Sequence, residues 1–253
     1  MSHIVLMTDF GQLDGYVGVM KGVIADIAPQ AQVIDLTHNL APQDLNAARF
    51  VLWNSYRYFP KRSIFVAVVD PGVGSQRHIL MLDTGQHIFI APDNGLLDYI
   101  LAENRVKHLL RIEEPKVMRS SISHTFHGRD IFAPAAAHLA AGYPLTMVGP
   151  MHPYHLPPSP FQALTPPETE GRIIHVDHFG NLISNLRFPA AEARGRVNLG
   201  AHQIAVHPTY AAVAEGQPLA LPGSHGLLEI AVRNGHAARA LDAQVGQIIR
   251  WSD

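Results

Sequence analysis

Two aspartates stand at positions where an enzyme can place reactive carboxylates. Asp9 and Asp70 each follow an apolar run rich in branched residues, which is typical of a buried strand. In an open parallel sheet the carboxyl ends of the strands line the ligand crevice, so we expect both carboxylates to face one cleft. The alternative is structural, because an aspartate after a strand often caps the next helix or opens a turn. Asp14 has a similar alternative, as the N-cap of a helix that begins near Tyr16.

The segment 70–77, with the sequence DPGVGSQR, combines a rigid Pro-Gly turn with a second glycine. Glycine lets the backbone approach a ligand closely, and the turn should leave the side chains of Asp70 and Arg77 near each other. The segment lacks the Lys-Ser/Thr pair of a Walker loop and the third glycine of a dinucleotide fingerprint. Phosphate binding is therefore disfavoured at this turn.

Histidine supplies the remaining candidate groups. His127 stands beside Gly128 where a helix is expected to begin, so its imidazole can face a ligand; the alternative is that it caps or packs. Three pairs have the spacing His-x-x-His, namely His124 with His127, His152 with His155 and His175 with His178. No His-Glu-x-x-His motif is present, and isolated pairs at this spacing are usually coincidental. We therefore expect no metal, and a metal-dependent hydrolase stays as an alternative.

These residues need a scaffold, and the apolar pattern of the first half of the chain predicts an α/β fold. Short branched runs at residues 4–7, 33–36, 64–69 and 87–91 alternate with helical spacing over residues 16–28, 96–101 and 130–141. Such alternation predicts a mostly parallel sheet covered by helices. After a stretch crowded with prolines, short strand-like runs follow at residues 171–176, 203–206, 227–232 and 247–251. We thus predict an α/β domain over residues 1–150, a proline-rich linker over 151–170 and a small all-β domain over 171–253.

Composition narrows the class of protein. The chain has 253 residues, a formal net charge of -2 and no cysteine, so no basic surface is expected for nucleic acid and no disulfide or thiolate chemistry arises. No stretch reaches the ~20 apolar residues that span a bilayer, and the first residues are read as a strand instead of a signal peptide. We expect a soluble, cytoplasmic protein with no nucleic-acid partner and no membrane partner.

Motifs in five separate places resemble those of one family. They are TDFG at residues 8–11, DPGVG at 70–74, FHGRD at 126–130, DHFGN at 177–181 and GSHG at 223–226. In this order they are similar to the motifs of the S-adenosyl-L-methionine (SAM) hydroxide adenosyltransferases, or adenosine-forming SAM hydrolases, which are related to the SAM-dependent fluorinase and chlorinase. The resemblance implies an N-terminal α/β domain, a C-terminal β-barrel and a homotrimer with ligand sites between subunits. It also implies that water attacks the ribose carbon bearing sulfur and splits SAM, the substrate, into adenosine and L-methionine without a cofactor.

The resemblance carries roles to individual residues. Asp70, Arg77 and His127 match the group associated with water activation. The implied substrate contacts are Asp9 to the ribose hydroxyls, Asp14 to the methionine ammonium, Ser224 to the methionine carboxylate, Asp177 to the methionine amine and Asn181 to the adenine edge. The chain departs from the fluorinase at His225, where the fluorinase has an arginine, and near Gln43, where it has an aromatic residue.

The carboxylate of Asp70 separates hydrolysis from halogenation. The resemblance implies that the halogenases carry a tyrosine at this position, and a negative charge there would repel a halide. Water is therefore the expected nucleophile. A SAM-dependent halogenase and a non-catalytic protein that binds SAM or adenosine remain the alternatives.

Overall fold

The computed structural model describes residues 2–164, 168–188 and 195–252 and divides the chain into two compact units. The N-terminal unit is Met1–Pro158 and the C-terminal unit is Ser159–Asp253. The division falls within the proline-rich stretch, where the missing backbone N–H groups of proline disfavour a continuing helix or central strand. Residues 165–167 of the predicted linker, and 189–194 and 253 of the predicted all-β domain, lie outside the described residues.

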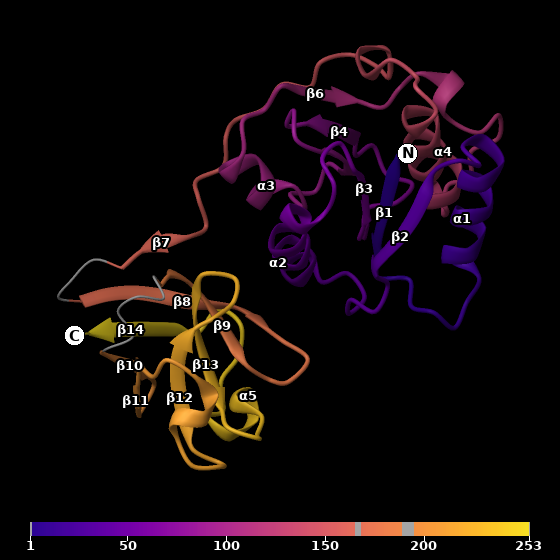
Figure 1. Ribbon diagram of the computed structural model, residues 1–253. Coiled ribbons are helices and arrows are strands. Elements are labelled where there is room, and N and C mark those ends of the chain that lie inside the picture. Colours follow the sequence, from indigo (N-terminus) through magenta and orange to yellow (C-terminus); the bar gives the residue numbers. More distant parts are fainter. Residues whose placement is uncertain (1, 165–167, 189–194, 253) are drawn as a thin grey trace. The chain divides into compact units, whose positions relative to one another are not determined.

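A six-stranded mixed sheet forms the centre of the N-terminal unit (Figure 1). Its strand order is β2-β1-β3-β5-β4-β6, and the bounds are β1 His3–Thr8, β2 Gln32–Thr37, β3 Ile64–Val68, β4 Ile79–Asp83, β5 Ile88–Pro92 and β6 His108–Arg111. β1 pairs in parallel with β2 and β3, and β3 pairs in parallel with β5. β4 pairs antiparallel with β5 and with β6. The prediction of a mostly parallel sheet is confirmed.

Helical segments pack on both faces of this sheet, which explains why its central strands are apolar throughout. The bounds are α1 Tyr16–Ile27, α2 Leu45–Ser55, α3 Asp98–Glu103 and α4 Ala133–Ala140, with shorter helices at Tyr56–Tyr58, Pro115–Val117, Gly128–Phe132 and Leu145–Met147. α1 and α4 share one core with alternate residues of β1 and β3, such as Leu6 and Val66. On the other face Phe65 stacks on Phe89 at 5.1 Å between ring centroids, and Tyr56, directly after α2, contacts Phe89 at 5.6 Å.

Some elements differ from the sequence-based prediction. The helix predicted over residues 130–141 begins as a π-helical turn at Gly128–Phe132 and becomes regular only in α4. Helix α1 has Gly15 as its N-cap with no side-chain cap hydrogen bond, so the alternative role of Asp14 as a cap is wrong. The prediction also lacks β4, β6 and α2, although α2 has a conventional N-cap in Asp44, which accepts from the backbone N–H of Ala47 at 2.9 Å.

An eight-stranded sheet forms the C-terminal unit. Its strands are β7 Gln162–Ala163, β8 Glu168–Val176, β9 Leu182–Arg187, β10 Arg196–Leu199, β11 His202–Ala205, β12 Pro218–Pro222, β13 Leu227–Val232 and β14 Ile248–Ser252, with short helices at Tyr210–Ala212 and Ala237–Ala240 (α5). Along the order β11-β10-β14-β8-β9-β13-β12 the described pairings are antiparallel, and β7 adds to β9 in parallel. A bridge between Val206 and Ala220 connects the two ends of this order around an apolar core. The sheet is therefore a nearly closed barrel, as the resemblance implies.

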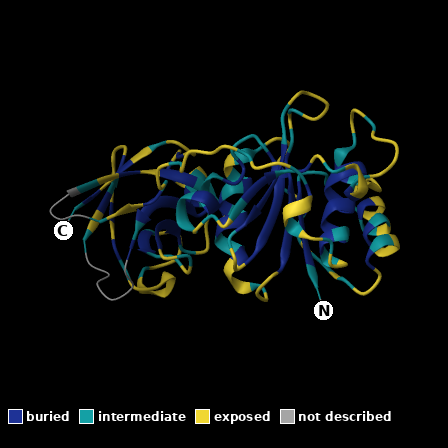
Figure 2. Cartoon of the chain, turned by 90° about the horizontal axis from the view of Figure 1, so that it is seen from above, coloured by how far each residue is buried: buried dark blue, intermediate teal, exposed yellow. Residues whose placement is uncertain are grey.

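The carboxyl ends of β1, β3 and β5 lie side by side at one edge of the N-terminal sheet, because these strands pair in parallel. They lead into Asp9, Asp70 and Asp93. Figure 2 shows the strands buried and many connecting loops exposed, so residues that follow these strands can meet a ligand. Within the ranges that the structure describes, no helix is long and apolar enough to cross a membrane.

Candidate active site

Asp70 and Arg77 form a nearly buried ion pair after β3. Arg77 Nε donates to the two carboxylate oxygens of Asp70, at 3.1 Å and 2.9 Å, and Nη2 makes a further contact with Oδ2. The side chains of Arg77 and Asp70 are 10% and 5% exposed, so salt in the solvent screens this pair little. The turn between them requires Gly74, whose φ is +80° and where an added Cβ would lie 2.5 Å from the carbonyl oxygen of His124. The turn thus brings together the two side chains that it is expected to join.

His127 completes the group from a distant part of the sequence. Arg77 Nη2 lies 2.8 Å from His127 Nδ1. Because a guanidinium only donates, Nδ1 must accept, and the proton of the neutral imidazole is on Nε2. Burial lowers the pKa of His127 and the charge of Arg77 lowers it further, which outweighs the opposite effect of the carboxylates of Asp70 and Asp130. His127 is therefore mainly neutral at pH 7.

Asp130 holds the segment that carries His127. Its buried carboxylate accepts from Arg129 Nε at 2.6 Å and from the backbone N–H of Ser123 at 2.9 Å. Ser123 Oγ in turn accepts from the backbone N–H of Phe126 at 3.0 Å. Burial alone would raise the pKa of Asp130, but the hydrogen bonds from Arg129 and Ser123 outweigh burial and lower the pKa to about 2. Asp130 is thus ionised at neutral pH and ties residues on both sides of His127.

An aromatic group connects the loop after β1 to the segment that carries His127. Phe10, Tyr16 and Phe126 contact one another edge to face, with ring centroids 5.2 to 6.1 Å apart. Gly128 leaves room for them, since an added Cβ would lie 3.2 Å from the ring of Phe126 and 3.3 Å from that of Phe10. The sequence motifs contain Phe10 and Phe126, but their spacing does not reveal that the rings meet. This contact places the loop of Asp9 next to the segment of His127.

Asp9 lies in this unit with one oxygen already bonded. Its Oδ2 accepts from the backbone N–H of Gln43 at 2.8 Å. Gln43 has a φ of 66°, a left-handed conformation that residues other than glycine seldom adopt. Among the described residues Oδ1 of Asp9 has no hydrogen-bond partner, so it can accept from a ligand. Asp14, by contrast, is exposed in the loop before α1, and the structure gives it no hydrogen bond to any described residue.

In the C-terminal unit, Asp177 and Asn181 close a tight loop between β8 and β9. Asp177 Oδ1 accepts from the backbone N–H of Phe179 at 2.9 Å and of Asn181 at 2.8 Å, and Oδ2 accepts from Asn181 Nδ2 at 3.0 Å. Asn181 also lines a hollow of ≈ 540 Å³, together with Phe179, Tyr210, Ala211 and residues 232–235. This volume is within the range of small-molecule sites. The structure therefore places Asn181 where a ligand of that size can bind.

Ser224 and His225 lie in the turn before β13, but only Ser224 is exposed. His225 Nδ1 accepts from the backbone N–H of Leu227 at 3.2 Å, and Nε2 lies 3.5 Å from Glu229 Oε2. Glu229 Oε1 accepts from the hydroxyl of Tyr210. Burial and the Glu229 carboxylate raise the pKa of Tyr210, so its hydroxyl stays protonated and donates. Glu229 and Tyr210 escape the sequence-based analysis, although a glutamate within a buried apolar strand is a visible signal.

The candidate residues thus fall into two groups. Asp70, Arg77 and His127 are in direct contact and share the N-terminal unit with Asp9 and Asp14, whereas Asp177, Asn181 and Ser224 belong to the C-terminal unit. Among the described residues, no three His, Asp or Glu side chains are arranged to hold a metal ion.

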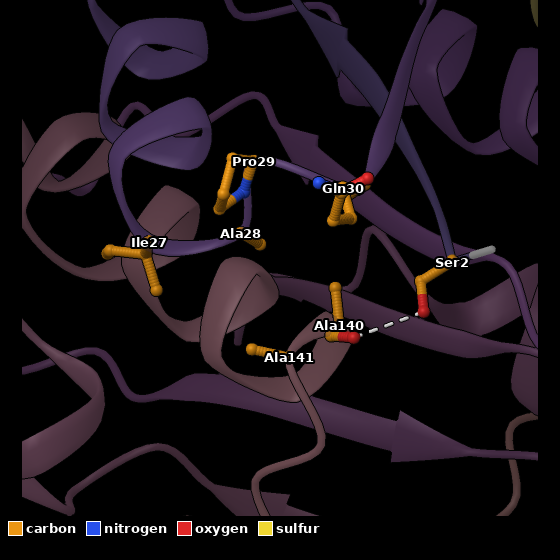
Figure 3. A pocket seen from close by; sticks show the side chains of 8 residues that line it. Ser2, Ile27, Ala28, Pro29, Gln30, Ala140 and Ala141 are labelled. Carbon is orange, nitrogen blue, oxygen red and sulfur yellow. Dashed lines mark hydrogen bonds between the residues drawn. The ribbon is translucent and has the colours of Figure 1, made fainter.

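A second hollow, of ≈ 450 Å³, lies at the amino end of β1 (Figure 3). It is lined by Ser2, residues 27–31, Ala140 and Ala141. Ser2 Oγ donates to the carbonyl oxygen of Ala140 at 3.1 Å across it. None of the lining side chains is titratable, so this hollow offers no acid or base, and the hydroxyl of Ser2 has no base among the lining residues to activate it. It also lies at the opposite end of β1 from Asp9.

Two family models and several relatives match this chain. The SAM hydroxide adenosyltransferase N-terminal domain matches residues 4–149, and the C-terminal domain of the same family matches residues 171–250. A protein of Thermus thermophilus named (R)-S-adenosyl-L-methionine hydrolase is 40% identical over 99% of this chain and 99% of its own. A protein of the same name from Salinispora arenicola is 40% identical over 96% of this chain and 95% of its own. A fluorinase of Actinopolyspora mzabensis is 25% identical over 98% of this chain and 96% of its own.

Solved structures agree with these matches. The crystal structure of a conserved protein from Thermotoga maritima covers 100% of both chains with a TM-score of 0.89 and 35% identity. A crystal structure from Thermus thermophilus covers 99% of this chain and 100% of its own, with a TM-score of 0.84 and 38% identity. Both domain models and both units of the fold therefore lead to one conclusion: the chain belongs to the SAM hydroxide adenosyltransferase family.

Proposed function

We propose that this chain hydrolyses SAM to adenosine and L-methionine by in-line attack of a water molecule on the ribose carbon that bears sulfur. The observation that carries the proposal is the contact of Asp70, Arg77 and His127 at the carboxyl edge of the N-terminal sheet. The relatives from T. thermophilus and S. arenicola support it, because both are named SAM hydrolases. Their names specify the R form, so we propose the R epimer at the sulfonium as the substrate.

The reaction needs little apparatus, because a sulfonium is a good leaving group. Methionine departs as a neutral thioether without a general acid, and the enzyme has to place a water molecule in line behind the carbon. We therefore propose that no metal and no cofactor takes part. The transition state loses positive charge at sulfur, so a neutral aromatic wall suits it better than a carboxylate would. The rings of Phe10, Tyr16 and Phe126, which contact one another beside the loop of Asp9, would provide such a wall.

The hydrogen bonds of Arg77 suggest different roles for His127, which would bind the water, and for Asp70, which would accept its proton. Since Arg77 occupies Nδ1 of His127, the imidazole offers Nε2–H, which would hold the water through its oxygen. Oδ2 of Asp70 accepts from both Nε and Nη2 of Arg77, whereas Oδ1 accepts only from Nε and keeps a lone pair. Oδ1 would therefore accept the proton of the water as the new C–O bond forms. Arg77 keeps the carboxylate aimed and balances its charge. After adenosine and methionine form, the proton passes from Asp70 to solvent.

We assign the substrate contacts by the family positions and the local geometry. Oδ1 of Asp9 would accept from the ribose hydroxyls, because Oδ2 is already held by Gln43. Asn181 would meet the adenine edge in the hollow of the C-terminal unit. The remaining contacts rest on motif position alone: Asp14 to the methionine ammonium, Asp177 to the methionine amine and Ser224 to the methionine carboxylate.

We also propose a cytoplasmic homotrimer, in which each site joins the N-terminal unit of one subunit to the C-terminal unit of its neighbour. The supporting observation is that the proposed contacts are divided between the two units. Leu13, Tyr16 and Val19 are exposed apolar residues around Asp14, and a neighbouring subunit would cover them. Sedimentation equilibrium tests the assembly, which requires the mass of three chains.

Incubation of the purified protein with SAM alone tests the reaction. Chromatography should show adenosine and methionine in equal amounts, from the R epimer, with a rate that a chelator leaves unchanged. A halogenated nucleoside formed in the presence of chloride or fluoride would instead support a halogenase. Bound adenosine without any turnover would support a binding protein. Asp9→Asn should raise KM for SAM if Asp9 holds the ribose.

A further inference from the structure

A chain of polar contacts runs beneath the loop of Asp9, outside the group of Asp70, Arg77 and His127. Lys21 Nζ lies 2.6 Å from Asp35 Oδ2, and His38 Nε2 lies 3.0 Å from Asp35 Oδ1. On its other side, His38 Nδ1 lies 2.9 Å from Thr8 Oγ1. His38 is 2% exposed and Thr8 is 0% exposed, so neither side chain is placed to touch substrate. The contacts therefore act on the protein itself.

An irregularity in β2 makes this chain of contacts possible. In the pairing of β1 with β2, Leu6 lies opposite Asp35 but Met7 lies opposite Thr37, so β2 contains one extra residue. In a regular strand, residues 35 and 38 would point to opposite faces and lie roughly 10 Å apart. The extra residue shifts this alternation and lets Asp35 and His38 meet. Bulges of this kind often re-aim a side chain next to an active site.

The donors and acceptors along the chain match when the imidazole of His38 carries its proton on Nε2. Burial would raise the pKa of Asp35, but the nearby imidazole of His38 and the hydrogen bond from Lys21 outweigh it and lower the pKa, so Asp35 is ionised. The carboxylate then faces Nε2–H of His38, which leaves Nδ1 to accept from the hydroxyl of Thr8. The oxygen of Thr8 accepts in turn from the backbone N–H of Phe10 at 3.2 Å.

His38 holds the Asp9 loop at both ends. Its side chain binds Thr8, directly before Asp9, and its carbonyl oxygen accepts from the backbone N–H of Gly11 at 2.8 Å. Between these two anchors the backbone of Phe10 is bonded to Thr8. The carboxylate of Asp9 projects from a segment whose backbone is therefore fixed within a few bonds on each side.

We propose that His38, held by Asp35 and acting through the hydroxyl of Thr8, is a positioning residue that aims the carboxylate of Asp9 at the ribose of the substrate. This inference rests on the proposed function, since it takes the ribose contact of Asp9 as given. A hydrogen bond within such a chain stabilises the aimed state by an amount equal to about a 3- to 10-fold change in an equilibrium constant. Asp9 would bind the ribose equally in the ground state and the transition state, so the change should appear in KM and not in kcat.

Two substitutions of Thr8 test the proposal. If Thr8 positions Asp9, Thr8→Val should raise KM more than Thr8→Ser does; if Thr8 acts only by packing, Thr8→Ser should raise KM more. Thr8→Val keeps the shape and removes the hydroxyl, whereas Thr8→Ser keeps the hydroxyl and removes a methyl group. If Thr8 positions Asp9, KM for SAM should rise about 3- to 10-fold in Thr8→Val and stay within about 2-fold of the parent in Thr8→Ser, with kcat nearly unchanged in both. A larger rise for Thr8→Ser, or a parental KM in Thr8→Val, overturns the proposal.

A double-mutant cycle with Asp9→Asn shows whether the effect passes through Asp9. Once the carboxylate is gone, adding Thr8→Val should not raise KM further. An equal rise in both backgrounds would mean that the hydroxyl acts elsewhere, and the proposal would fail. If Asp9→Asn itself leaves KM unchanged, the ribose assignment fails instead, which separates the two hypotheses.

A matched control comes from another buried hydroxyl of the same unit. Ser63 is 0% exposed and its Oγ donates to the carbonyl oxygen of Pro60 at 2.6 Å, at the amino end of β3. Ser63→Ala should lower the melting temperature without changing KM. Should Thr8→Val fail to fold, His38→Gln replaces it: the amide still reaches toward Asp35 but withdraws the acceptor from Thr8, so the same rise in KM is expected.

Discussion

Replacing Asp70 with asparagine separates its two roles, as proton acceptor and as the partner of Arg77. Asparagine keeps the shape but cannot take a proton at neutral pH, so kcat should fall by about 10²- to 10⁴-fold. The same change leaves the guanidinium of Arg77 charged and only 10% exposed. Removing one partner of a buried ion pair costs about 3–5 kcal/mol. Because the amide oxygen of asparagine still accepts a hydrogen bond, we expect about 3 kcal/mol, the lower end of that range.

Thermal unfolding measures this loss of stability as a decrease in Tm. In a chain of this size 1 kcal/mol corresponds to roughly 2–4 °C in Tm, so Asp70→Asn should lower Tm by about 6–12 °C. A second substitution, Arg77→Met, removes the unpaired charge and keeps an apolar side chain of similar length. The double variant D70N/R77M should therefore recover most of the lost Tm, while its kcat stays as low as that of Asp70→Asn.

Calorimetry of the four proteins and chromatographic assays of adenosine release give both readouts. If the two single losses of Tm simply add in the double variant, the side chains are not coupled and the ion pair has no energetic importance. If Asp70→Asn retains kcat within about tenfold of the parent, Asp70 is not the proton acceptor. Recovery of kcat in the double variant would show that the stray charge of Arg77, and not the loss of a base, had stopped the reaction.

Further predictions concern other parts of the N-terminal unit. Burial and the charge of Arg77 lower the pKa of His127, so the kcat/KM of the parent should begin to fall only at a pH below the usual pKa of histidine. In Arg77→Met the charge is gone, so a pH–rate profile should show this fall at a higher pH than in the parent. The pKa of Asp130 falls from 3.8 to about 2 on folding, so its contribution to stability is complete above the higher value and disappears as pH falls through the lower one. The difference in Tm between the parent and Asp130→Asn should therefore shrink over that interval, and a difference independent of pH would contradict the assignment. Asp44→Ala removes the N-cap of α2 and should cost about 1 kcal/mol, seen as a Tm roughly 2–4 °C lower, with kcat/KM unchanged.

The sequence alone predicts those parts of the fold and of the candidate site whose geometry is determined by one short segment. β1 and β3 are buried on both faces, so their apolar runs are unbroken and the aspartates after them are visible as strand-end residues. Asp70 and Arg77 meet because the turn between them is local, with Gly74 as its left-handed residue. Both features depend on residues that are close in the sequence, so the pattern of residue types predicts them.

Contacts made by tertiary packing cannot be predicted in this way, because they join residues that are far apart in the sequence. Arg77 and His127 are 50 residues apart, so neither their contact nor the tautomer that it imposes follows from spacing. The departure at His225 is visible in the sequence, but its partner Glu229 belongs to an apolar strand and the hydroxyl donor Tyr210 to the short helix at Tyr210–Ala212. The bulge of β2 is equally hidden, because it exists only in the register between two strands.

The π-helical turn at Gly128–Phe132 sets the direction of the imidazole before it. Such a turn contains one residue more than a regular α-helix would use. Each residue of an α-helix rotates the chain by about 100°, so deleting one residue here would swing His127 around the helix axis while α4 kept its seat in the core. The number of residues in this one turn therefore determines the orientation of the His127 imidazole, independently of how α4 packs in the hydrophobic core.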